Sequence, residues 1–346
     1  MTEEASRLEL MGAPGSPYTR KMLALLRYRR IPHAIMWGGH QAPPAGYPEP
    51  KVKLLPTVYF RDASGVLEAA VDSTPILRRL EREVPGRSVI PPDPAIGFLN
   101  DLIEDFADEW LTKAMFHFRW YHQADRENAG PLLVYWSQPT LAADAAQHAA
   151  EAFTKRQFDR LYVVGSNDVT ALTIEASYER FVSILDALVA ARGYMLGARP
   201  ASADFAIYGQ LTQLALVEPT SAAITAKRSP RVRAWLDRME DLSGLRDVAD
   251  DWSDRDTLAG ALGPFLTEIG RVYAPFLLAN ASAVMSGADQ VEAEIDGRPW
   301  TQPPFPYQAK CLAALREARD ALSSDDQAWV DATLSGTGCE ALFQQA

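Results

Sequence analysis

The sequence is poor in cysteine, because its 346 residues contain only Cys311 and Cys339. Two thiols cannot build a disulfide framework or a cysteine-rich zinc site, so neither is expected. Histidines are also few, and His117 and His122 are five residues apart, which does not put them on one helical face. We therefore predict no metal cofactor.

The chain also lacks long apolar runs and an excess of basic residues. No stretch reaches the ~18 uninterrupted apolar residues that cross a bilayer, and residues 1–6 lack the basic and apolar regions of a signal peptide. We expect a cytoplasmic protein with no membrane partner. The formal net charge of −11 gives no sign of a nucleic-acid partner. The length suggests two domains or more, and a hydrophobic share of 47% is ample for packed cores.

Residues 8–29 contain the most informative motif, an apolar strand pattern that runs into Gly15-Ser16-Pro17-Tyr18 and then into a helical pattern. The motif sets the Ser16 hydroxyl at a helix N-terminus, where backbone N–H groups lack intrahelical partners and stabilise an anion. A thiolate, the reactive form of a thiol, suits that position. Ordinary capping is the alternative, because serine and proline commonly begin helices. The motif has no cysteine, which argues against thiol–disulfide exchange.

Two further motifs follow along the chain. Residues 53–60 predict a strand entered through Leu55-Pro56, and Asp72-Ser73 precedes a helical pattern over residues 76–82. With a strand expected over residues 33–37, the order of elements predicts a small mixed α/β layer. Plain helix capping is the alternative explanation of Asp72-Ser73.

The order and spacing of Ser16-Pro17-Tyr18, Leu55-Pro56 and Asp72-Ser73 make residues 1–84 resemble the α/β thioredoxin-like domain of the cytosolic glutathione transferase superfamily. The resemblance implies glutathione as co-substrate and Ser16 as the catalytic hydroxyl that donates to its thiolate. Tyr18 is the alternative hydroxyl.

The same resemblance implies the remaining contacts of glutathione. Leu55 and Pro56 form a cis-proline step whose backbone pairs with a peptide-like ligand. Asp72 faces the γ-glutamyl ammonium, and Ser73 binds the γ-glutamyl carboxylate at a second helix N-terminus. The candidate contacts of the glycyl carboxylate are His40, Gln41 and Lys51.

A linker over residues 84–94 leads to residues 95–245, which resemble the all-helical second domain of the same superfamily. Helical patterns cover residues 96–121, 142–162, 171–191, 203–216 and 231–242. In the resembled fold the first of these helices borders the pocket for a hydrophobic electrophile, and its aromatic residues suit such a ligand. The pocket candidates are Tyr18, Trp110, Arg119 and Trp120, although core and dimer packing better explains most of the aromatic residues.

The first long helical pattern also carries acidic residues at three- and four-residue spacing. This pattern predicts a solvated acidic face. Asp204 is predicted to cap a later helix, but the capping box is incomplete because Ala201 stands where serine or threonine is usual. The acidic residues concerned are Asp101, Glu104, Asp105, Asp108 and Glu109.

Residues 246–346 extend beyond the resemblance and read as a mostly helical C-terminal extension. Helical patterns over residues 258–285, 307–322 and 327–334 surround a strand-like pattern over residues 291–297. Pro264 and Pro275 are expected to break or kink the first of these helices. The extension either adds stability or a dimer contact, which is the default, or covers the pocket. In the second case the residues expected to reach the ligand are Tyr273, Phe276, Trp300, Phe305 or Tyr307.

Together these patterns predict a glutathione transferase, expected to be a homodimer with a detoxification role, that stabilises the glutathione thiolate for attack on a hydrophobic electrophile. Leu54 stands where the family commonly carries lysine, and this difference and the extension also permit a non-catalytic binding or assembly protein. A glutathione-dependent isomerase or lyase uses the same first domain, and the sequence does not separate it from a transferase.

Overall fold

The computed structural model describes residues 7–38, 43–246 and 251–344. His40 and Gln41, two of the candidate contacts of the glycyl carboxylate, lie outside these residues. Within them, no helix is both long and apolar enough to cross a membrane.

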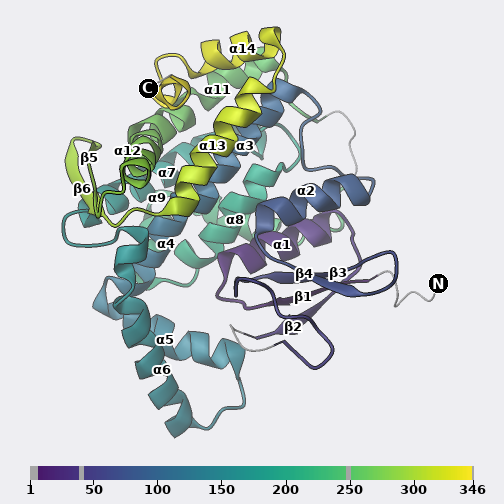
Figure 1. The fold of residues 1–346 in the computed structure, drawn as a ribbon, viewed down its shortest axis with the longest axis vertical. Helices are drawn as coiled ribbons and strands as arrows, with labels where there is room; N and C mark the ends of the chain where they lie inside the picture. Colours follow the sequence, from purple (N-terminus) through teal and green to yellow (C-terminus); the bar gives the residue numbers. More distant parts are fainter. Residues whose placement is uncertain (1–6, 39–42, 247–250, 345–346) are drawn as a thin grey trace.

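The N-terminal part is a four-stranded sheet with two helices beside it (Figure 1). The strands lie in the order β2-β1-β3-β4; β1 and β2 are parallel, and β3 runs antiparallel to both β1 and β4. This is the thioredoxin-like arrangement that the sequence predicts. The elements are β1 Leu8–Gly12, α1 Pro17–Tyr28, β2 His33–Trp37, β3 Thr57–Arg61, β4 Leu67–Ala70 and α2 Ser73–Glu83.

The strand register brings the three predicted motifs to one end of the sheet. Met11 near the end of β1 pairs with Thr57 at the start of β3, and Val58 pairs with Ala70 at the end of β4. Three turns therefore lie at the same end of the sheet: the one after β1, the one before β3 and the one after β4. These turns carry Ser16, Leu55-Pro56 and Asp72.

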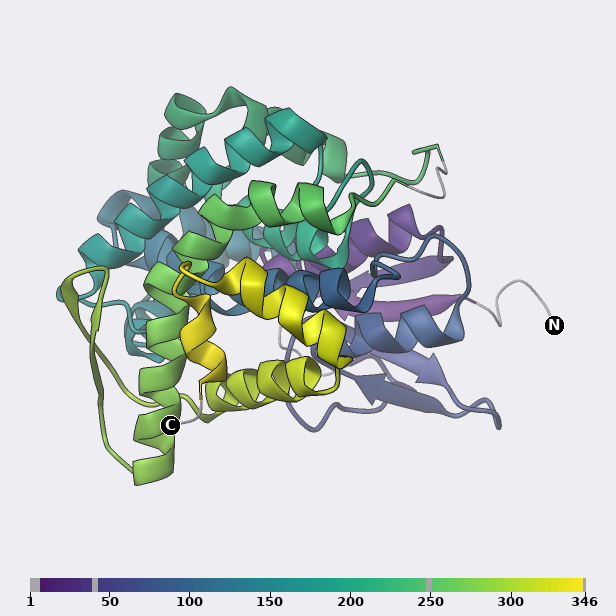
Figure 2. The same ribbon diagram turned by 90° about the horizontal axis from the view of Figure 1, so that it is seen from above.

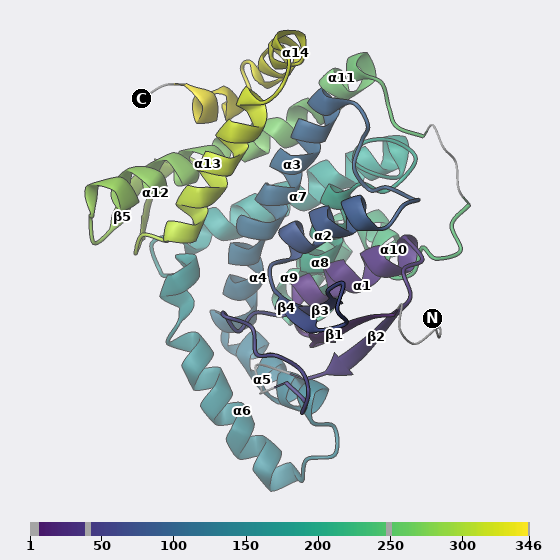
Figure 3. The ribbon, with the colours of Figure 1, turned by 45° about the vertical axis from the view of Figure 1, so that its right-hand side comes forward.

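A helical part follows, in which α3 and α4 form the central column (Figure 3). The predicted helix over residues 96–121 is divided at Trp110, which ends α3 and begins α4. The helices are α3 Pro94–Glu109, α4 Leu111–Trp120, α5 Gln123–Ser137, α6 Ala143–Phe158, the 3₁₀ helix η2 Leu161–Val164, α7 Ala171–Arg192, α8 Ser202–Leu214, α9 Pro219–Arg228 and α10 Pro230–Met239.

Helices α5 and α6 form a hairpin that projects away from the rest of the helices, at the lower left of Figure 1. Ala146 and Ala150 of α6 are buried against α5, and Gly130 of α5 permits a close approach to Thr154. The second half of α5 lies beside the sheet end that carries the three motifs (Figures 1 and 3), since a Cβ at Gly15 would contact Leu133 and Trp136.

The C-terminal extension folds back over α3, and α13 and α14 both pack against that helix (Figure 2). A π-helical turn, η3, separates α11 from α12, so the pattern over residues 258–285 is interrupted just before Pro275, one of the two prolines expected to break or kink it. The elements are α11 Arg255–Glu268, η3 Ile269–Tyr273, α12 Ala274–Ser286, β5 Val291–Ile295, β6 Arg298–Gln302, α13 Pro306–Asp320, α14 Ser324–Leu334 and the 3₁₀ helix η4 Cys339–Phe343.

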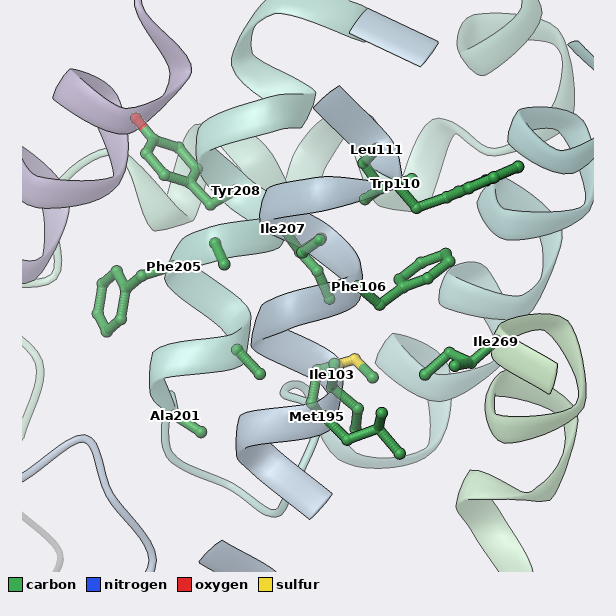
Figure 4. Close-up of a cluster of buried hydrophobic side chains, with 14 of the residues drawn as sticks. Ile103, Phe106, Trp110, Leu111, Met195, Ala201, Phe205, Ile207, Tyr208 and Ile269 are labelled. Carbon is green, nitrogen blue, oxygen red and sulfur yellow. The ribbon is translucent and has the colours of Figure 1, made fainter. Parts of the chain in front are cut away.

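The core is continuous from the sheet to the extension, and Figure 4 shows the part where α3, α4 and α8 meet. Phe106 packs edge-on against Phe265 and Tyr273 of the extension. On the other side, α8 lies close to α1, because a Cβ at Gly209 would stand 2.5 Å from the carbonyl oxygen of Pro17. The extension is therefore part of the same folded body and not an appended tail.

Asp204 caps α8 as predicted, and the capping box is half complete. Its carboxylate accepts hydrogen bonds from the backbone N–H of Ala201 and of Met195, each 2.9 Å long. Ala201 has no side-chain acceptor to offer in return, so the reciprocal half of the box is missing. This is a folding contact.

Candidate functional site

Ser16 caps α1 and lies beside the turn that precedes β3. Its Oγ accepts a hydrogen bond from the N–H of Thr19 at 3.2 Å and donates to the carbonyl oxygen of Leu55 at 3.4 Å. The hydroxyl is half-buried at the positive end of the helix dipole. The long contact to Leu55 is the one that a stronger acceptor, such as a thiolate, would replace.

The peptide bond between Leu55 and Pro56 is cis, as the sequence predicts. Among the residues that the structure describes, none accepts a hydrogen bond from the Leu55 N–H. Leu55 is half-buried, whereas Leu54 is exposed. The turn therefore presents a backbone donor beside Ser16, and the position where the family commonly has lysine carries an exposed apolar side chain.

Asp72 and Ser73 form the start of α2 at the same end of the sheet. Asp72 has a φ of 76°, a backbone conformation that non-glycine residues seldom adopt and that recurs at functional sites. Its Oδ1 accepts from the N–H of Thr74 at 3.3 Å. Ser73 is buried, and within the described part of the chain its N–H and hydroxyl have no hydrogen-bond partner. Two donors are thus available to an anion at this helix N-terminus.

One residue of the extension reaches this site. The hydroxyl of Tyr307, in the first turn of α13, donates to Oδ2 of Asp72 at 2.7 Å. Burial and the Asp72 carboxylate both raise the pKa of Tyr307 above its ordinary value, so the hydroxyl keeps its proton. Tyr307 was one of five aromatic residues of the extension named as candidates. Within the described residues, the other four make no hydrogen bond to Ser16, Leu55 or Asp72, and Tyr273, Phe276 and Trp300 are buried in the core.

Tyr18, the alternative hydroxyl, is engaged elsewhere. Its hydroxyl donates to the carbonyl oxygen of Asp108 at 2.7 Å and lies 2.8 Å from Oγ1 of Thr112. Burial, followed by the charges of Glu109 and Asp108, raises its pKa well above the ordinary value. Tyr18 therefore ties α1 to the junction of α3 and α4.

The predicted solvated acidic face of α3 is wrong. Glu104 and Asp108 are buried, and both accept hydrogen bonds from the buried ammonium of Lys21, at 2.8 Å and 2.6 Å. Burial opposes ionisation of Glu104, but Lys21 and Arg78 outweigh it and bring its pKa to about 2. The carboxylates face α1, α2 and the extension because those elements pack onto α3, a tertiary arrangement that i,i+4 spacing does not reveal.

The same helix carries two carboxyl groups that have no cation in hydrogen-bond contact among the described residues. Asp105 accepts from the hydroxyl of Tyr273 at 2.6 Å, and Glu109 accepts from Gln308 Nε2 at 2.9 Å. Burial raises the pKa of Asp105 to about 7 and that of Glu109 to about 8. The interior between α3 and the extension is therefore rich in acidic groups that resist ionisation.

Three of the pocket candidates, Trp110, Arg119 and Trp120, are buried side chains. Trp110 donates to Ser177 Oγ at 3.1 Å and packs against Trp300, with ring centroids 5.3 Å apart. Trp120 packs against the α5–α6 hairpin. Both indoles are core elements here, as the packing alternative holds.

Arg119 supports the turn that carries Ser16. Its guanidinium donates to the carbonyl oxygen of Gly15 at 2.9 Å and pairs with Glu218 and Gln213, both buried. The amide of Gln213 in turn donates to the carbonyl oxygen of Pro14. Helices α4 and α8 thus fix the backbone just before Ser16.

Side chains from α5 also lie against this turn, and no motif in the sequence marks them. A Cβ at Gly15 would stand 2.2 Å from Leu133 Cδ2 and 3.1 Å from the ring of Trp136. Leu133 and Trp136 are half-buried. An apolar surface therefore borders the residue that precedes Ser16. Its signal in the sequence is weak, because the two positions fall in a helix with no clear apolar face.

The chain combines a thioredoxin-like sheet with an all-helical part that follows it. A serine stands at the start of α1, and a cis-proline turn lies beside it. These features together define a class of proteins. Two family models match this chain: the glutathione S-transferase N-terminal domain over residues 10–88 and the glutathione S-transferase C-terminal domain over residues 144–238. The chain belongs to the glutathione transferase superfamily.

Several solved structures are similar to this chain. A glutathione transferase from Burkholderia graminis, with two glutathione molecules bound per subunit, is 16% identical over 67% of this chain and 82% of its own, with a TM-score of 0.42. A family member from Pseudomonas fluorescens, with two glutathione bound, is 13% identical over 68% and 89%, with a TM-score of 0.44. A Tau class enzyme from mango is 17% identical over 74% and 96%, with a TM-score of 0.40. No curated protein matches the sequence.

Proposed function

We propose that this protein is a glutathione-dependent transferase in which the turn at Ser16 activates the glutathione thiol. The observation that carries the proposal is the meeting of three groups at one sheet end: the Ser16 hydroxyl, the N–H of Leu55 and the N-terminus of α2. Family membership supports the same ligand.

The thiol loses its proton to water, and the resulting thiolate accepts the hydrogen bond that Ser16 otherwise gives to Leu55. The dipole of α1 adds to this stabilisation. The sulfur then attacks an electrophilic carbon, so that a C–S bond forms and either a leaving group departs with the displaced electron pair or a double bond takes up the charge. Ser16 thus lowers the thiol pKa without forming a covalent bond.

The γ-glutamyl end of glutathione carries charges that match Asp72 and Ser73 at the start of α2. Its ammonium fits the Asp72 carboxylate, whose negative charge adds to burial in raising the pKa of Asp108. Its carboxylate fits the two donors of Ser73 that have no partner within the described residues. A zwitterionic amino-acid end is therefore the ligand class that satisfies both groups.

The hydrophobic electrophile is proposed to bind against Leu133 and Trp136 of α5. These side chains lie next to Gly15 and hence on the side from which a carbon approaches a sulfur held at Ser16. Trp110 and Trp120 support the fold behind this surface. An apolar or aromatic electrophile suits an indole and an isobutyl group.

Calorimetric titration with reduced glutathione at neutral pH tests the proposal. Saturable binding by the full chain that is weakened at least tenfold in Asp72→Asn, but unchanged in Glu68→Gln, supports it. Glu68 is the matched control because it is an exposed carboxylate of the same sheet, paired only with Arg79 at the surface. Absence of heat at millimolar glutathione overturns the proposal and favours a non-catalytic binding or assembly protein.

Three further parts of the proposal have their own measurements. Product analysis after incubation with glutathione separates conjugation from isomerase or lyase chemistry. Sedimentation equilibrium tests the proposed homodimer. Fractionation of cells tests the proposed cytoplasmic location and detoxification role in the compartment where glutathione is abundant.

A further inference from the structure

A second cluster of side chains, separate from the site at Ser16, brings together three atoms that could bind a metal ion. Its members are His117, His122 and Glu175. His117 belongs to α4, His122 immediately precedes α5, and Glu175 lies on α7. One side-chain nitrogen or oxygen of each residue lies within 4.8 Å of the others. The spacing of the two histidines predicts no ligand role for them, because residues five apart do not share a helical face. The end of α4 at Trp120 removes that objection, since His122 lies beyond the helix.

The distances fit metal ligands. Oε1 of Glu175 is 3.2 Å from Nε2 of His117 and 3.0 Å from Nε2 of His122. Ligands about 2.0–2.2 Å from a tetrahedral zinc ion stand about 3.3 Å from one another. Two of the three distances between the ligand atoms are therefore already close to those of a tetrahedral zinc site.

A pure hydrogen-bond explanation leaves one atom unexplained. Nε2 of His122 is shielded from solvent, and although it is close to Glu175 it makes no hydrogen bond within the described part of the chain. A buried polar atom without a partner carries a desolvation cost. A metal ion shared with Glu175 and His117 would use the nitrogen lone pair of His122, whereas a direct N–H···O bond does not have suitable geometry here.

The other nitrogen of His117 is held as it is in metal sites. Nδ1 lies 2.8 Å from Oγ of the buried Ser166, which leaves Nε2 to face Glu175. The ring of Tyr121 stacks on the His117 imidazole at 4.5 Å, and the Tyr121 hydroxyl donates to Asp168. A second nitrogen fixed by a neighbour is the usual way in which a ligating histidine is oriented.

We propose that His117, His122 and Glu175 bind one divalent first-row transition-metal ion, with Zn²⁺ as the expected occupant. Two imidazoles and a carboxylate are borderline ligands that zinc accepts. The side chains of His122 and Glu175 are 31% and 30% exposed, so solvent reaches the cluster and can supply a water molecule as the fourth ligand. The ion joins α4, the start of α5 and α7.

This connection gives the ion a structural role at the base of the α5–α6 hairpin. The hairpin carries Leu133 and Trp136, which border the turn at Ser16. The metal site itself depends on neither glutathione nor the proposed reaction, so it stands or falls separately from them.

Metal binding is measured on the full, tag-free chain after treatment with a chelator. Co²⁺ is the probe, because its visible absorption reports tetrahedral or five-coordinate geometry, and Zn²⁺ competition reports affinity. The wild-type chain is expected to bind one Co²⁺ with a visible spectrum that Zn²⁺ abolishes. Ser166→Ala is expected to weaken Zn²⁺ binding about 10- to 100-fold, as loss of a ligand's hydrogen-bond partner does.

The decisive variants are His122→Ala and Glu175→Gln, which should lose the spectrum, while His148→Ala should keep it. His148 is an exposed histidine on α6 whose ring contacts only a backbone carbonyl. Glu175→Gln keeps the size and a hydrogen-bonding group, and circular dichroism reports whether each variant is folded. No Co²⁺ spectrum from the wild-type chain overturns the proposal, and so does equal binding by Glu175→Gln, which would mean adventitious surface binding.

Discussion

Tyr307 and Asp72 are 235 residues apart in sequence and are joined by a 2.7 Å hydrogen bond from the tyrosine hydroxyl to Oδ2 of the carboxylate. The contact links the first turn of α13 to the residue that begins α2. Asp72 thereby has both oxygens held, one by Thr74 and one by Tyr307. The C-terminal extension, which lies outside the two family models, therefore takes part in shaping the candidate glutathione site.

Tyr307→Phe is expected to weaken glutathione binding about fivefold, because one hydrogen bond of about 1 kcal/mol no longer orients Asp72. The turnover number with saturating glutathione should stay within twofold of the wild type. Calorimetry and steady-state kinetics measure the two effects, and Tyr162→Phe, at an exposed tyrosine, is the control. Tighter binding by Tyr307→Phe would show instead that the hydroxyl competes with the ligand ammonium.

Ser16→Ala is expected to lower turnover at least tenfold and to raise the pH at which the bound thiol ionises, while the affinity for glutathione changes less. The reason is that the hydroxyl donates to the thiolate more strongly than to the thiol. Thiolate absorbance against pH measures the shift. Ser16→Thr should restore part of the activity.

A control is needed because Ser16→Ala also removes a helix cap, which costs about 1 kcal/mol of stability. Ser323→Ala removes an equivalent cap, at the start of α14, since Ser323 Oγ accepts from the N–H of Asp326. It should lose stability and keep activity. Unchanged turnover in Ser16→Ala would contradict the role of the hydroxyl and show that backbone N–H groups stabilise the thiolate instead.

Trp136→Ala is expected to raise KM for an aromatic electrophile about tenfold and to leave glutathione affinity unchanged, because the indole borders the turn at Ser16 but not the start of α2. Tyr135→Ala, the exposed neighbour on α5, is the control. Kinetics with both substrates varied separates the two affinities. An equal effect of the two variants would argue against an electrophile site on α5.

Lys21→Met is expected to destabilise the fold by about 3–5 kcal/mol, because it leaves the buried carboxylate of Asp108 without its cation and Glu104 with Arg78 alone. Lys155→Met removes an exposed i,i+4 pair with Asp159 and should cost less than about 1 kcal/mol. Urea unfolding measures both. Equal small losses would mean that water or protonation compensates for the missing ammonium.

The thioredoxin-like layer and the positions of its three turns could be predicted from sequence because their signals are local. Ser16 and Asp72 are helix caps, Leu55-Pro56 marks the entry to a strand, and the strand order then brings them together. Their chemical roles remain predictions. The half-complete cap at Asp204 could be predicted for the same reason, since a cap depends on neighbours within a few residues.

Other features depend on which elements pack together, and no local signal carries that information. Glu104 was expected on a solvated acidic face, and no local signal marks Lys21 as its partner. Both are buried because α1, α2 and α3 meet. Trp136 lines the turn at Ser16 only because the α5–α6 hairpin lies beside the sheet. Tyr307 was one of five candidates, and only the fold of α13 separates it from the rest.

The burial of Asp105 between α3 and the extension makes a pH-dependent prediction. Burial raises the pKa of this carboxyl from 3.8 to about 7, and the Tyr273 hydroxyl, the Cys311 thiol and the carboxyls of Asp108 and Glu104 face it. The folded chain therefore keeps a proton there that the unfolded chain releases above pH 3.8. Stability contributed by Asp105 falls as pH rises between about 4 and 7 and is constant above that range.

Asp105→Asn removes this titration and keeps an oxygen that accepts from Tyr273. The difference in unfolding free energy, wild type minus variant, should fall by about 1 kcal/mol per pH unit between pH 4 and 7, since one proton is linked to unfolding. Urea unfolding at several pH values measures it. Asp237→Asn, at an exposed aspartate paired with Arg233, is the control. A flat difference for Asp105→Asn would mean that Asp105 is ionised in the folded chain, and that the extension leaves it open to water.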